Sequence, residues 1–322
     1  MSIPQSQKAL ALPGPLDHYT LITRPVPTPG EGDVLVRVES TGLNPAENHV
    51  TKEATRWVLQ GYPALTGTDG AGTIVALGKG VVGFEVGDRV FFQEASSIPL
   101  AFATAAFGLS LPVNREPKGL GGAGLKPFWE AGAQNAYKDK PIVVLGGSSS
   151  IASYLGFNPI VTTASAHNAD HLKRIGATDF VDRKADLASA LKQIIPAAPI
   201  EVIFDAVHTP LQQADVDLLS PGGVIATIWP VPEGEDALKL SEGRVATYFY
   251  GSVHLHKELG IAMYARLTEF LEKDIIKVSI QPLKVEKLPN GLGGIVDGLA
   301  RLDRREVSGF KLVASPPETP DF

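Results

Sequence analysis

Cysteine is absent from the sequence, and its absence removes several kinds of chemistry. Without cysteine there is no disulfide framework, no thiolate nucleophile and no cysteine-ligated zinc site. Charge is also modest, since 29 basic and 35 acidic residues give a net charge of −6. This balance offers no basic surface for nucleic acid or for an anionic membrane, so we expect neither as a partner. Any redox chemistry must come from a cofactor, and a small-molecule substrate is the expected partner.

Long apolar segments are scarce as well. The N-terminal residues contain no apolar targeting segment, which makes a cytoplasmic location the expectation. One uncharged stretch, Ala95–Val113, approaches the length of a membrane span. Pro99, Gly108 and Pro112 interrupt it, so we predict a buried helix there instead.

The pattern of apolar residues predicts an α/β protein with two lobes. At 322 residues, 44% of them apolar, the chain can fill two cores. Alternating segments in the first third predict an all-β lobe, with strands at Val34–Glu39, Gly72–Ala76 and Asp88–Phe92. From Pro141, apolar strands alternate with helical segments, which is typical of a doubly wound parallel sheet. The strands predicted for it are Ile142–Leu145, Ile160–Thr163, Phe180–Asp182, Val202–Val207 and Val224–Trp229.

Three further segments complete this outline. The stretch Asn114–Lys140 is rich in glycine and lysine, so we expect an ordered surface loop or hinge rather than a core element. Apolar residues at helical spacing predict one amphipathic helix over Glu258–Lys273. The last strand that the sequence predicts is a short one, Phe310–Ala314.

The strongest chemical motif follows the first strand of the parallel sheet. There the chain runs into a turn of small residues and then a helix; the turn comprises Gly146, Gly147, Ser148, Ser149 and Ser150. A dinucleotide pyrophosphate needs unhindered backbone N–H groups at such a place, and serine hydroxyls add donors. The alternative is a tight turn that needs glycine only for its backbone conformation.

The turn after the second strand bears on the choice of cofactor. NAD sites place an acidic residue here to bind the ribose hydroxyl, whereas this turn contains Ser165, His167 and Asn168. Small polar residues can accept a 2′-phosphate, with Lys173 and Arg183 as countercharges, so we predict NADPH. The alternative is that Ser165 and Asn168 merely cap the next helix.

Several motifs together resemble one family. They are Gly67–Val75, Val86–Val90, Ala95–Ala105, Leu172–Ala177 and Val307–Val313. Over nearly its whole length the chain is similar to the zinc-free, quinone-oxidoreductase-like medium-chain dehydrogenases/reductases, close to fungal trans-acting enoyl reductases of the lovastatin type. The resemblance implies a GroES-like lobe in two parts, residues 1–93 and 265–322, around a Rossmann domain at 94–264 with a linker loop at 114–140.

The same resemblance implies a function. It implies hydride transfer from NADPH to an enone or enoyl group of a small molecule or polyketide intermediate. A polyketide synthase or acyl carrier would then be a partner of a monomer or homodimer. A quinone or carbonyl reductase, or a catalytically silent nucleotide-binding scaffold of the same fold, remains an alternative.

The resemblance also implies positions for the reacting groups. Relatives carry a lysine where this chain has His49, with Lys52 close by, so both are candidate proton donors; a plain rim residue is the alternative for His49. The ends of the fourth and fifth strands are expected to surround the nicotinamide, through Asp205, Ala206, Val207, Ile228 and Trp229.

Zinc is not expected. Zinc-dependent cousins use cysteine ligands, which this chain lacks. His254 and His256 would place two imidazoles on one face of a strand, but no third ligand is apparent. An ordinary surface or subunit-interface strand is the preferred interpretation, and Asp69 is expected to shape a turn rather than to do chemistry.

Two connections are shorter than in the family that the chain resembles. Only Ser148–Asn158 joins the first two strands of the parallel sheet, whereas a crossover with its helix needs at least about a dozen residues. The chain also runs directly from Gln93 into Glu94, where relatives insert strands that close the β lobe. We therefore predict a stunted helix, weak cofactor affinity and low stability.

Overall fold

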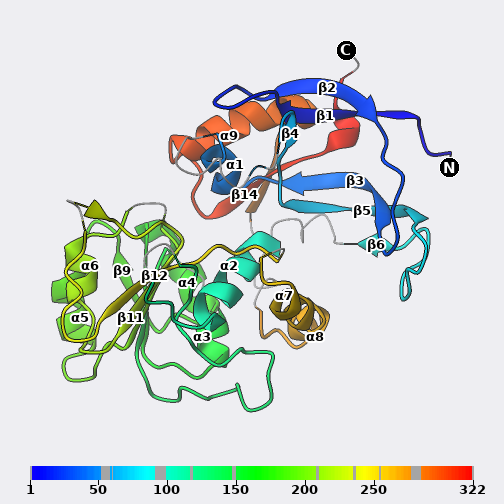
Figure 1. Cartoon of the computed structure of the whole chain (residues 1–322). Coiled ribbons are helices and arrows are strands. Elements are labelled where there is room, and N and C mark those ends of the chain that lie inside the picture. The colour runs from blue at the N-terminus through cyan, green and yellow to red at the C-terminus, as the bar shows by residue number, and fades with distance from the viewer. Residues whose placement is uncertain are drawn as a thin grey trace. The chain divides into compact units, whose positions relative to one another are not determined.

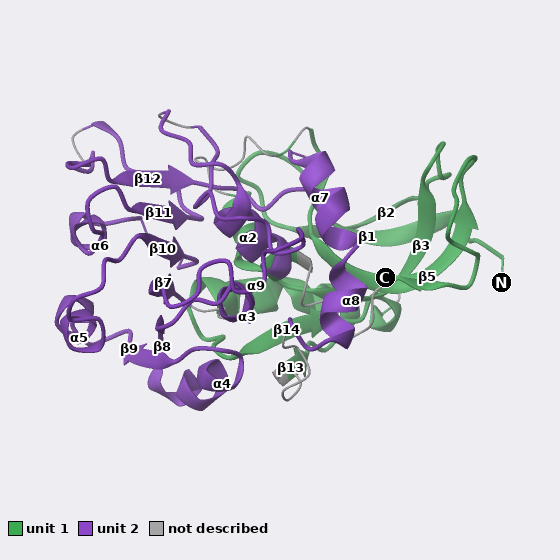
Figure 2. Ribbon diagram, turned by 90° about the horizontal axis from the view of Figure 1, so that it is seen from below, with its two compact units in different colours: residues 1–101, 282–322 green, residues 102–281 purple. Residues whose placement is uncertain are grey.

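The chain folds into two compact units, drawn in different colours in Figure 2. Unit 1 combines residues 1–101 with 282–322, and unit 2 comprises residues 102–281. The computed structural model describes residues 2–51, 59, 61–90, 99–116, 119–146, 150–207, 210–234, 237–253, 255–276 and 284–320. The units change at other positions than the expected 93 and 265. The later return to unit 1 has a packing cause, because Phe270 lies 5.1 Å from Phe128 between ring centroids and belongs to unit 2.

Within the described residues, unit 1 contains a three-stranded sheet, β2-β1-β4, and a five-stranded sheet, β13-β14-β3-β5-β6 (Figure 1). Its strands are β1 Ser6–Leu12, β2 Thr20–Pro25, β3 Val34–Gly42, β4 Ala64–Leu65, β5 Asp69–Leu77, β6 Arg89–Val90, β13 Lys284–Lys287 and β14 Phe310–Ala314. Its helices are α1 Pro45–His49 and α9 Ile295–Asp303, with 3-10 turns η5 Gly291–Gly294 and η6 Pro316–Glu318. The predicted β lobe is confirmed.

The pairing of β3 with β5 is central to the five-stranded sheet of unit 1. These antiparallel strands run together from Val34 opposite Leu77 to Gly42 opposite Asp69. Gly72 is required in this pairing, because a Cβ there would lie 2.0 Å from the carbonyl oxygen of Arg37.

Within the described residues, unit 2 contains a six-stranded parallel sheet in the order β12-β11-β10-β7-β8-β9. Its strands are β7 Ile142–Leu145, β8 Ile160–Ala164, β9 Asp179–Asp182, β10 Val202–Asp205, β11 Val224–Thr227 and β12 Val245–Tyr248. The five predicted strands are all present, although β10 and β11 end two residues earlier than predicted. The sixth strand, β12, was missed because four residues of mixed polarity give little signal.

Unit 2 also contains the helices α3 Ser150–Tyr154, α4 Ala169–Arg174, α5 Leu187–Ile194, α6 Gln213–Asp217, α7 Lys257–Tyr264 and α8 Leu267–Glu272, with the 3-10 turn η3 Ala166–Asn168. In the chain, α3 to α6 lie between strands of this sheet, whereas α7 and α8 follow β12. The single helix predicted over Glu258–Lys273 is wrong, since two short helices meet at Ala265 and Arg266. The uncharged stretch forms α2, Pro99–Ser110, as predicted. No helix in the described part of the chain is long and apolar enough to span a membrane.

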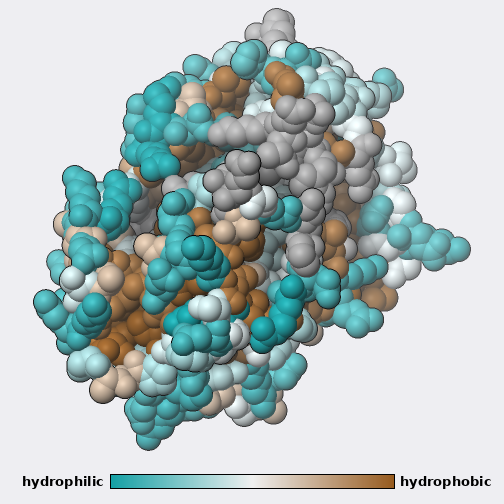
Figure 3. Space-filling view, turned by 60° about the vertical axis from the view of Figure 1, so that its left-hand side comes forward, coloured by the Kyte–Doolittle hydropathy of each residue, from teal (hydrophilic) through white to brown (hydrophobic). Residues whose placement is uncertain are grey.

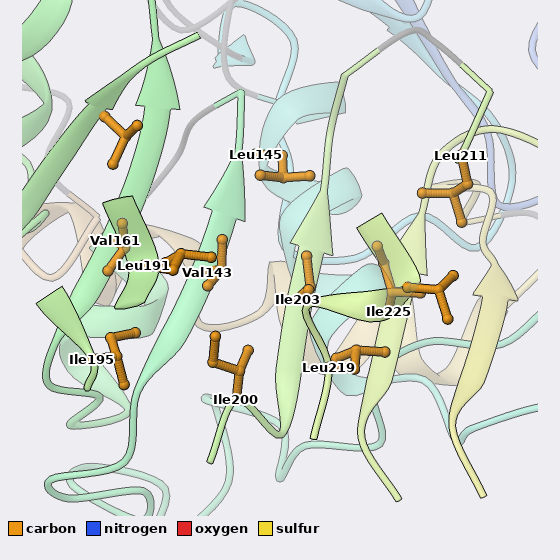
Figure 4. Close-up of a cluster of buried hydrophobic side chains, with 12 residues drawn as sticks. Val143, Leu145, Val161, Leu191, Ile195, Ile200, Ile203, Leu211, Leu219 and Ile225 are labelled. Atoms are coloured by element: carbon orange, nitrogen blue, oxygen red, sulfur yellow. The ribbon is translucent and has the colours of Figure 1, made fainter. Parts of the chain in front are cut away.

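The core of unit 2 lies between the sheet and its helices. Figure 4 shows Val143 of β7 and Val161 of β8 beside Leu191 of α5, and Ile203 of β10 and Ile225 of β11 near Leu219. Val143, Ile203 and Ile225 are completely buried, and burial of each such side chain contributes about 1.5–3 kcal/mol.

The expectation for Asn114–Lys140 is wrong. The described part of this segment is irregular, but it belongs to the core. Phe128 is 1% exposed and Ala133 is completely buried, while Leu120 forms a parallel bridge with Tyr248 beside β12. Aromatic burial therefore outweighs the glycine and lysine content that suggested a surface loop.

Apolar side chains also remain on the surface. In the face shown in Figure 3, apolar side chains are exposed between hydrophilic ones. Large examples in unit 1 are Val38, Leu65 and Val82, which are 42%, 44% and 86% exposed.

Candidate functional site

The carboxyl edge of the parallel sheet in unit 2 is a topological switch point. From β7 the chain adds β8 and β9 on one side, then returns to add β10, β11 and β12 on the other side. Strand order therefore reverses between β7 and β10, which is where parallel α/β sheets bind ligands. Register places Leu145 of β7 beside Asp205 of β10 and beside Thr163 of β8.

Gly146 sits at this switch point directly after β7. Its φ is +79°, and a Cβ there would lie 2.9 Å from Cγ2 of Val207. Its N–H donates to the carbonyl of Thr163 at 3.1 Å, which fixes the turn against β8. A residue with a side chain would strain this turn and fill the space above it. The structure thus brings three of the predicted cofactor-binding residues, Gly146, Ala206 and Val207, close together, and their contact with a cofactor stays a prediction.

The rest of the glycine and serine turn is only partly described. Gly147, Ser148 and Ser149 lie outside the described residues, so their contact with a pyrophosphate stays a prediction. Ser150 is buried and begins α3, which is five residues long. The short connection predicted this stunted helix. Five residues barely exceed one helical turn, so most of the N–H groups of α3 have no partner within the helix.

The turn after β8 brings together candidates for recognition of the cofactor ribose. Ser165 precedes η3, which contains His167 and Asn168, and its side chain makes no capping hydrogen bond. The capping alternative therefore receives no support for Ser165. The Arg183 N–H donates to the carbonyl of Ala164 at 2.9 Å, so Arg183 follows β9 directly beside this turn.

Two further charged residues belong to the elements that follow this turn, α4 and β9. Lys173 is exposed in the last turn of α4, eight positions after Ser165 in the chain. Asp182, which the sequence pattern did not mark as a site residue, pairs with Ala164 in the register of β8 and β9. Its Oδ1 accepts the N–H of Lys184 at 2.8 Å. Asp182 could have been found from the sequence, because parallel pairing of the strands predicted at Ile160–Thr163 and Phe180–Asp182 brings their carboxyl ends together.

Asp205 is the buried polar group at the end of β10. It is 3% exposed, its Oδ1 accepts the N–H of Val207 at 2.8 Å, and its Oδ2 accepts the hydroxyl of Thr227 at 3.1 Å. Burial raises the pKa of its carboxyl from 3.8 to about 6, although these hydrogen bonds act in the opposite direction. Asp205 thereby ties the ends of β10 and β11 together.

The network continues into the residues predicted to surround the nicotinamide. The Thr227 hydroxyl oxygen accepts the N–H of Trp229 at 3.1 Å, and the N–H of Ile228 donates to the Asp205 carbonyl at 3.2 Å. Thr227 was not predicted, although a polar residue at the end of an apolar strand beside a switch point was a usable signal.

Unit 1 contains a second polar cluster, formed by Asn44, Asp69 and Lys311. Asp69 has no exposed side-chain surface, and its Oδ2 lies 3.1 Å from the ammonium of Lys311. The Asn44 amide donates to the same oxygen at 2.9 Å, and its carbonyl accepts from Lys311. The N–H of Leu100 donates to the other Asp69 oxygen at 2.9 Å. Asp69 is therefore the acceptor at the centre of this cluster rather than only a turn residue.

The helix α1 extends from this cluster. Its N-cap, Asn44, forms a capping box with Glu47, whose Oε2 accepts the Asn44 N–H at 2.6 Å. Burial raises the pKa of the Glu47 carboxyl above its usual range. His49 ends α1 and is half-buried. Lys52, the other predicted proton donor, lies outside the described residues.

The histidine pair gives no support for metal binding. His254 lies outside the described residues, and His256 is the N-cap of α7, with its ring 5.5 Å from that of Phe107. The described part of the predicted strand is wrong, because Leu255 and His256 form turns that lead into α7. Where the structure describes the chain, no group of three or more histidine, cysteine, aspartate or glutamate residues could hold a metal ion.

Known families match both parts of the chain. The family described as "Alcohol dehydrogenase GroES-like domain" matches residues 30–124, and "Zinc-binding dehydrogenase" matches residues 148–266. Dehydrogenase azaJ of Aspergillus niger is 26% identical over 365 residues, which cover 96% of this chain and 99% of the relative. Trans-enoyl reductase RAP2 of Pyricularia oryzae is 26% identical, covering 90% of this chain and 93% of that protein.

A solved structure shares the fold. Quinone oxidoreductase of Escherichia coli, complexed with NADPH, has a TM-score of 0.69 at 15% identity and covers 96% of this chain and 99% of that one. The Aspergillus alignment of 365 residues is longer than the 322-residue chain, so that relative carries internal segments that this chain lacks. The two predicted positions of the missing segments stay predictions. The two domain matches, the relatives and the shared fold identify the chain as an oxidoreductase of the medium-chain dehydrogenase/reductase family.

Proposed function

We propose that this chain is an NADPH-dependent reductase that adds hydride to an activated carbon–carbon double bond of a small molecule or polyketide intermediate. The proposal needs no zinc. Support at the level of the substrate comes from the trans-enoyl reductase of Pyricularia oryzae, which is similar over 90% of this chain. The observation that carries the cofactor assignment is the turn after β8, where Ser165 stands beside Arg183.

The described residues at the switch point fit a dinucleotide. At Gly146 a Cβ would lie within 3.6 Å of Ala206 and closer still to Val207, so only glycine leaves room for a phosphate to approach the backbone. The exposed side chains of Lys173 and Arg183 would neutralise a 2′-phosphate. The carboxyl of Asp182 works against this binding, and its Oδ1 accepts the N–H of Lys184 at 2.8 Å.

Bound NADPH supplies the hydride for this chemistry. The residues of the chain orient the reactants. Asp205 and Thr227 hold the strand ends together, and they accept the backbone N–H groups of Ile228 and Trp229, which fixes the backbone there. After hydride arrives at the β-carbon, the substrate enolate must gain a proton. We assign His49 as the donor, with Lys52 as the alternative.

The cofactor assignment is tested by titrating NADPH and NADH and following their fluorescence. We expect NADPH to bind more tightly, and Ser165→Asp to shift the preference toward NADH by about tenfold, because a carboxylate repels a 2′-phosphate. Ser241→Asp is the matched control, since Ser241 is exposed and precedes β12 at the opposite edge of the sheet. Equal affinities in the unchanged protein, or equal effects of both substitutions, would contradict the assignment.

The substrate class is tested by following NADPH oxidation with an enone, an aldehyde and a quinone. We expect the enone to turn over fastest and a chelator to leave the rate unchanged. A faster aldehyde or quinone would favour a carbonyl or quinone reductase, and cofactor binding without any turnover would favour a silent scaffold. Loss of activity in chelator, restored by zinc, would overturn the zinc-free assignment. A polyketide synthase or acyl carrier partner, and a monomeric or homodimeric state, are part of the same proposal.

A further inference from the structure

Unit 1 contains a hollow of about 660 Å³ between the sheet of β1 and β4 and the sheet of β3 and β5 (Figure 1). Leu10 lines it from one sheet and Val36 and Val75 from the other, while Ile295 and Leu299 line it from α9. Its described lining residues all belong to unit 1, and none of them is assigned to the proposed reduction. Pockets for small molecules have volumes of about 300–1,000 Å³, so the hollow has the size of a ligand site.

The wall of the hollow exposes apolar surface that a packed pair of sheets would bury. Ile3, Val38 and Leu65 all line the hollow, and they are 43%, 42% and 44% exposed. In a closed sandwich the inward side chains of the two sheets interdigitate and leave no such surface. An apolar ligand would restore these contacts and remove that surface from water.

The basic side chains of the wall already have partners. Among the described lining residues they are Lys8 of β1 and Arg37 of β3. The guanidinium of Arg37 forms an ion pair with Glu39 at 3.2 Å, and the ammonium of Lys8 donates to the carbonyl of Pro320 at 2.6 Å. An anionic ligand would therefore have to displace a carboxylate or a carbonyl that is already bound.

The acidic side chain among the described lining residues, Glu47, is engaged as well. Its carboxylate accepts hydrogen bonds from the Asn44 N–H at 2.6 Å and from the Thr68 hydroxyl at 3.2 Å. Burial raises the pKa of this carboxyl, which favours its neutral form. The wall thus offers a ligand no free charge of either sign, and an ionised group would enter an apolar space without a counterion. This arrangement selects a neutral molecule.

The hydroxyl groups of the wall donate their protons to partners inside the protein. The Tyr19 hydroxyl donates to the Glu47 carbonyl at 2.8 Å, and its oxygen lies 2.8 Å from that of Thr66. Because Tyr19 has a single hydroxyl proton, the Thr66 hydroxyl is the donor in this pair. Thr41 donates likewise to the Asp69 carbonyl at 2.7 Å. A hydroxyl oxygen that has donated its proton can still accept, so Thr66 offers a ligand an acceptor and no donor.

We propose that the hollow of unit 1 binds a neutral apolar alcohol, with its hydrocarbon part between the two sheets and its hydroxyl donating to the Thr66 oxygen. Three features of the wall define this class of ligand. The exposed apolar surface requires a hydrocarbon, the paired charges disfavour an ionised group, and the Thr66 acceptor favours a hydroxyl over a carbonyl. The site does not depend on the proposed reaction, because the predicted nucleotide-binding residues belong to unit 2.

The test titrates the full-length protein with Nile red, a neutral apolar dye, and follows its fluorescence. Saturated primary alcohols of increasing length then compete with the dye. Burial of each added methylene should tighten binding about fourfold until the hollow is full. Affinity that is independent of chain length would overturn the proposal.

Matched ligands test the polar end of the molecule. The alcohol should bind about fivefold more tightly than the methyl ketone with the same number of carbons, because only the alcohol can donate to Thr66. The carboxylate of the same length should bind at least about tenfold more weakly than the alcohol, since its charge finds no free counterion. A carboxylate or a ketone that binds as tightly as the alcohol would contradict the assigned ligand class.

The acceptor is tested by Thr66→Val, which keeps the shape of the side chain and the bond from Tyr19 to the Glu47 carbonyl. It should abolish the preference for the alcohol and leave the affinity for the ketone unchanged. Thr23→Val is the matched control, since Thr23 is exposed on β2 and is not among the described lining residues. It should leave the preference intact. An unchanged preference in Thr66→Val would show that another group receives the hydroxyl.

A filling substitution locates the site. Val38→Phe occupies the hollow from β3 and should weaken binding at least about tenfold without lowering the melting temperature, because it covers apolar surface. Val82→Phe is the matched control, since Val82 is 86% exposed and is not among the described lining residues. It should leave binding unchanged. If Val38→Phe loses its cooperative melt, Leu10→Phe repeats the test from the facing sheet.

Enzyme assays separate this site from the substrate site. Val38→Phe and Val82→Phe should both oxidise NADPH at the unchanged rate with a short enone, and the dye titrations remain decisive even if no enone is reduced. Normal alcohol binding in both filled variants would place the ligand elsewhere and overturn the proposal. Competition between the alcohol and the enone would do the same. Assembly of the protein into dimers that dissociate on Val38→Phe would show that a second copy, rather than a ligand, covers the hollow.

Discussion

Replacement of Asp205 by asparagine should make the fold of unit 2 less sensitive to pH. Asp205 is 3% exposed, and its carboxyl accepts hydrogen bonds from two neutral donors, the Val207 N–H and the Thr227 hydroxyl. Asparagine has nearly the same shape. Its carbonyl can accept from Val207, and its amide can donate to the Thr227 oxygen, so the substitution keeps both contacts while removing the charge.

The size and sign of the effect follow from the pKa of the folded state. Burial raises the pKa of Asp205 from 3.8 to about 6. Each pKa unit corresponds to 1.36 kcal/mol, so ionisation costs the folded state about 3 kcal/mol. Below pH 3.8 the carboxyl is protonated in both states and nothing is lost. Stability falls as the pH rises from about 4 to about 6, because the unfolded chain releases its proton first, and above that range the full cost remains.

The assay is urea unfolding between about pH 4 and pH 8, followed by tryptophan fluorescence. Two of the three tryptophans, Trp129 and Trp229, belong to unit 2, so the signal reports mainly on this unit. The difference in unfolding free energy between Asp205→Asn and the unchanged protein should rise from near zero to about 3 kcal/mol across this range. Asp139→Asn, an exposed position in the same unit, should stay within about 0.5 kcal/mol. A flat difference for Asp205→Asn, or one that favours the aspartate at high pH, would refute the reasoning.

Three other perturbations test the buried cluster, the turn and the short crossover. Lys311→Met should lower the unfolding free energy of unit 1 by about 3–5 kcal/mol, because it leaves the buried Asp69 carboxylate without its cation. Lys140→Met breaks an exposed ion pair and should cost far less, so equal losses in urea unfolding would show that the buried pair is no more stabilising than the exposed one. Gly146→Ala should lower both stability and NADPH affinity, while Gly222→Ala, with nearly the same φ but open space around it, should leave affinity unchanged. Lengthening α3 by two turns should raise NADPH affinity and the melting temperature; low-micromolar binding and cooperative melting at about 45–65 °C in the unchanged chain would contradict this.

Much of the fold was readable from sequence because local patterns determine it. The apolar run at Ile142–Leu145 predicted β7 at the correct residues, and the final strand Phe310–Ala314 was equally clear. Gly146 was identified because a pyrophosphate needs unhindered backbone N–H groups where a strand runs into a turn of small residues. Its φ of +79° also fits the alternative, a tight turn that needs glycine for its backbone conformation. The short connection after β7 predicted a stunted helix, and α3 has five residues.

Other features depend on contacts between distant parts of the chain. The segment Asn114–Lys140 is buried because Phe128 packs against Phe270, and no local pattern in a glycine-rich stretch reveals such a partner. The break between α7 and α8 is also absent from the periodicity, which continues across Arg266. In each case the apolar pattern showed which residues are buried but did not show which residues they pack against.

The polar clusters show the division most clearly. The sequence determined that Asp205 ends a buried strand at a switch point, because strand order follows from the alternation of strands and helices. Only the tertiary structure decided that Thr227 and Val207 hold its carboxylate, and that Lys311, 242 positions after Asp69, supplies the charge that the latter needs. Local chemistry fixes which groups must find partners on burial, whereas the partners themselves depend on register and packing between segments that are remote in the chain.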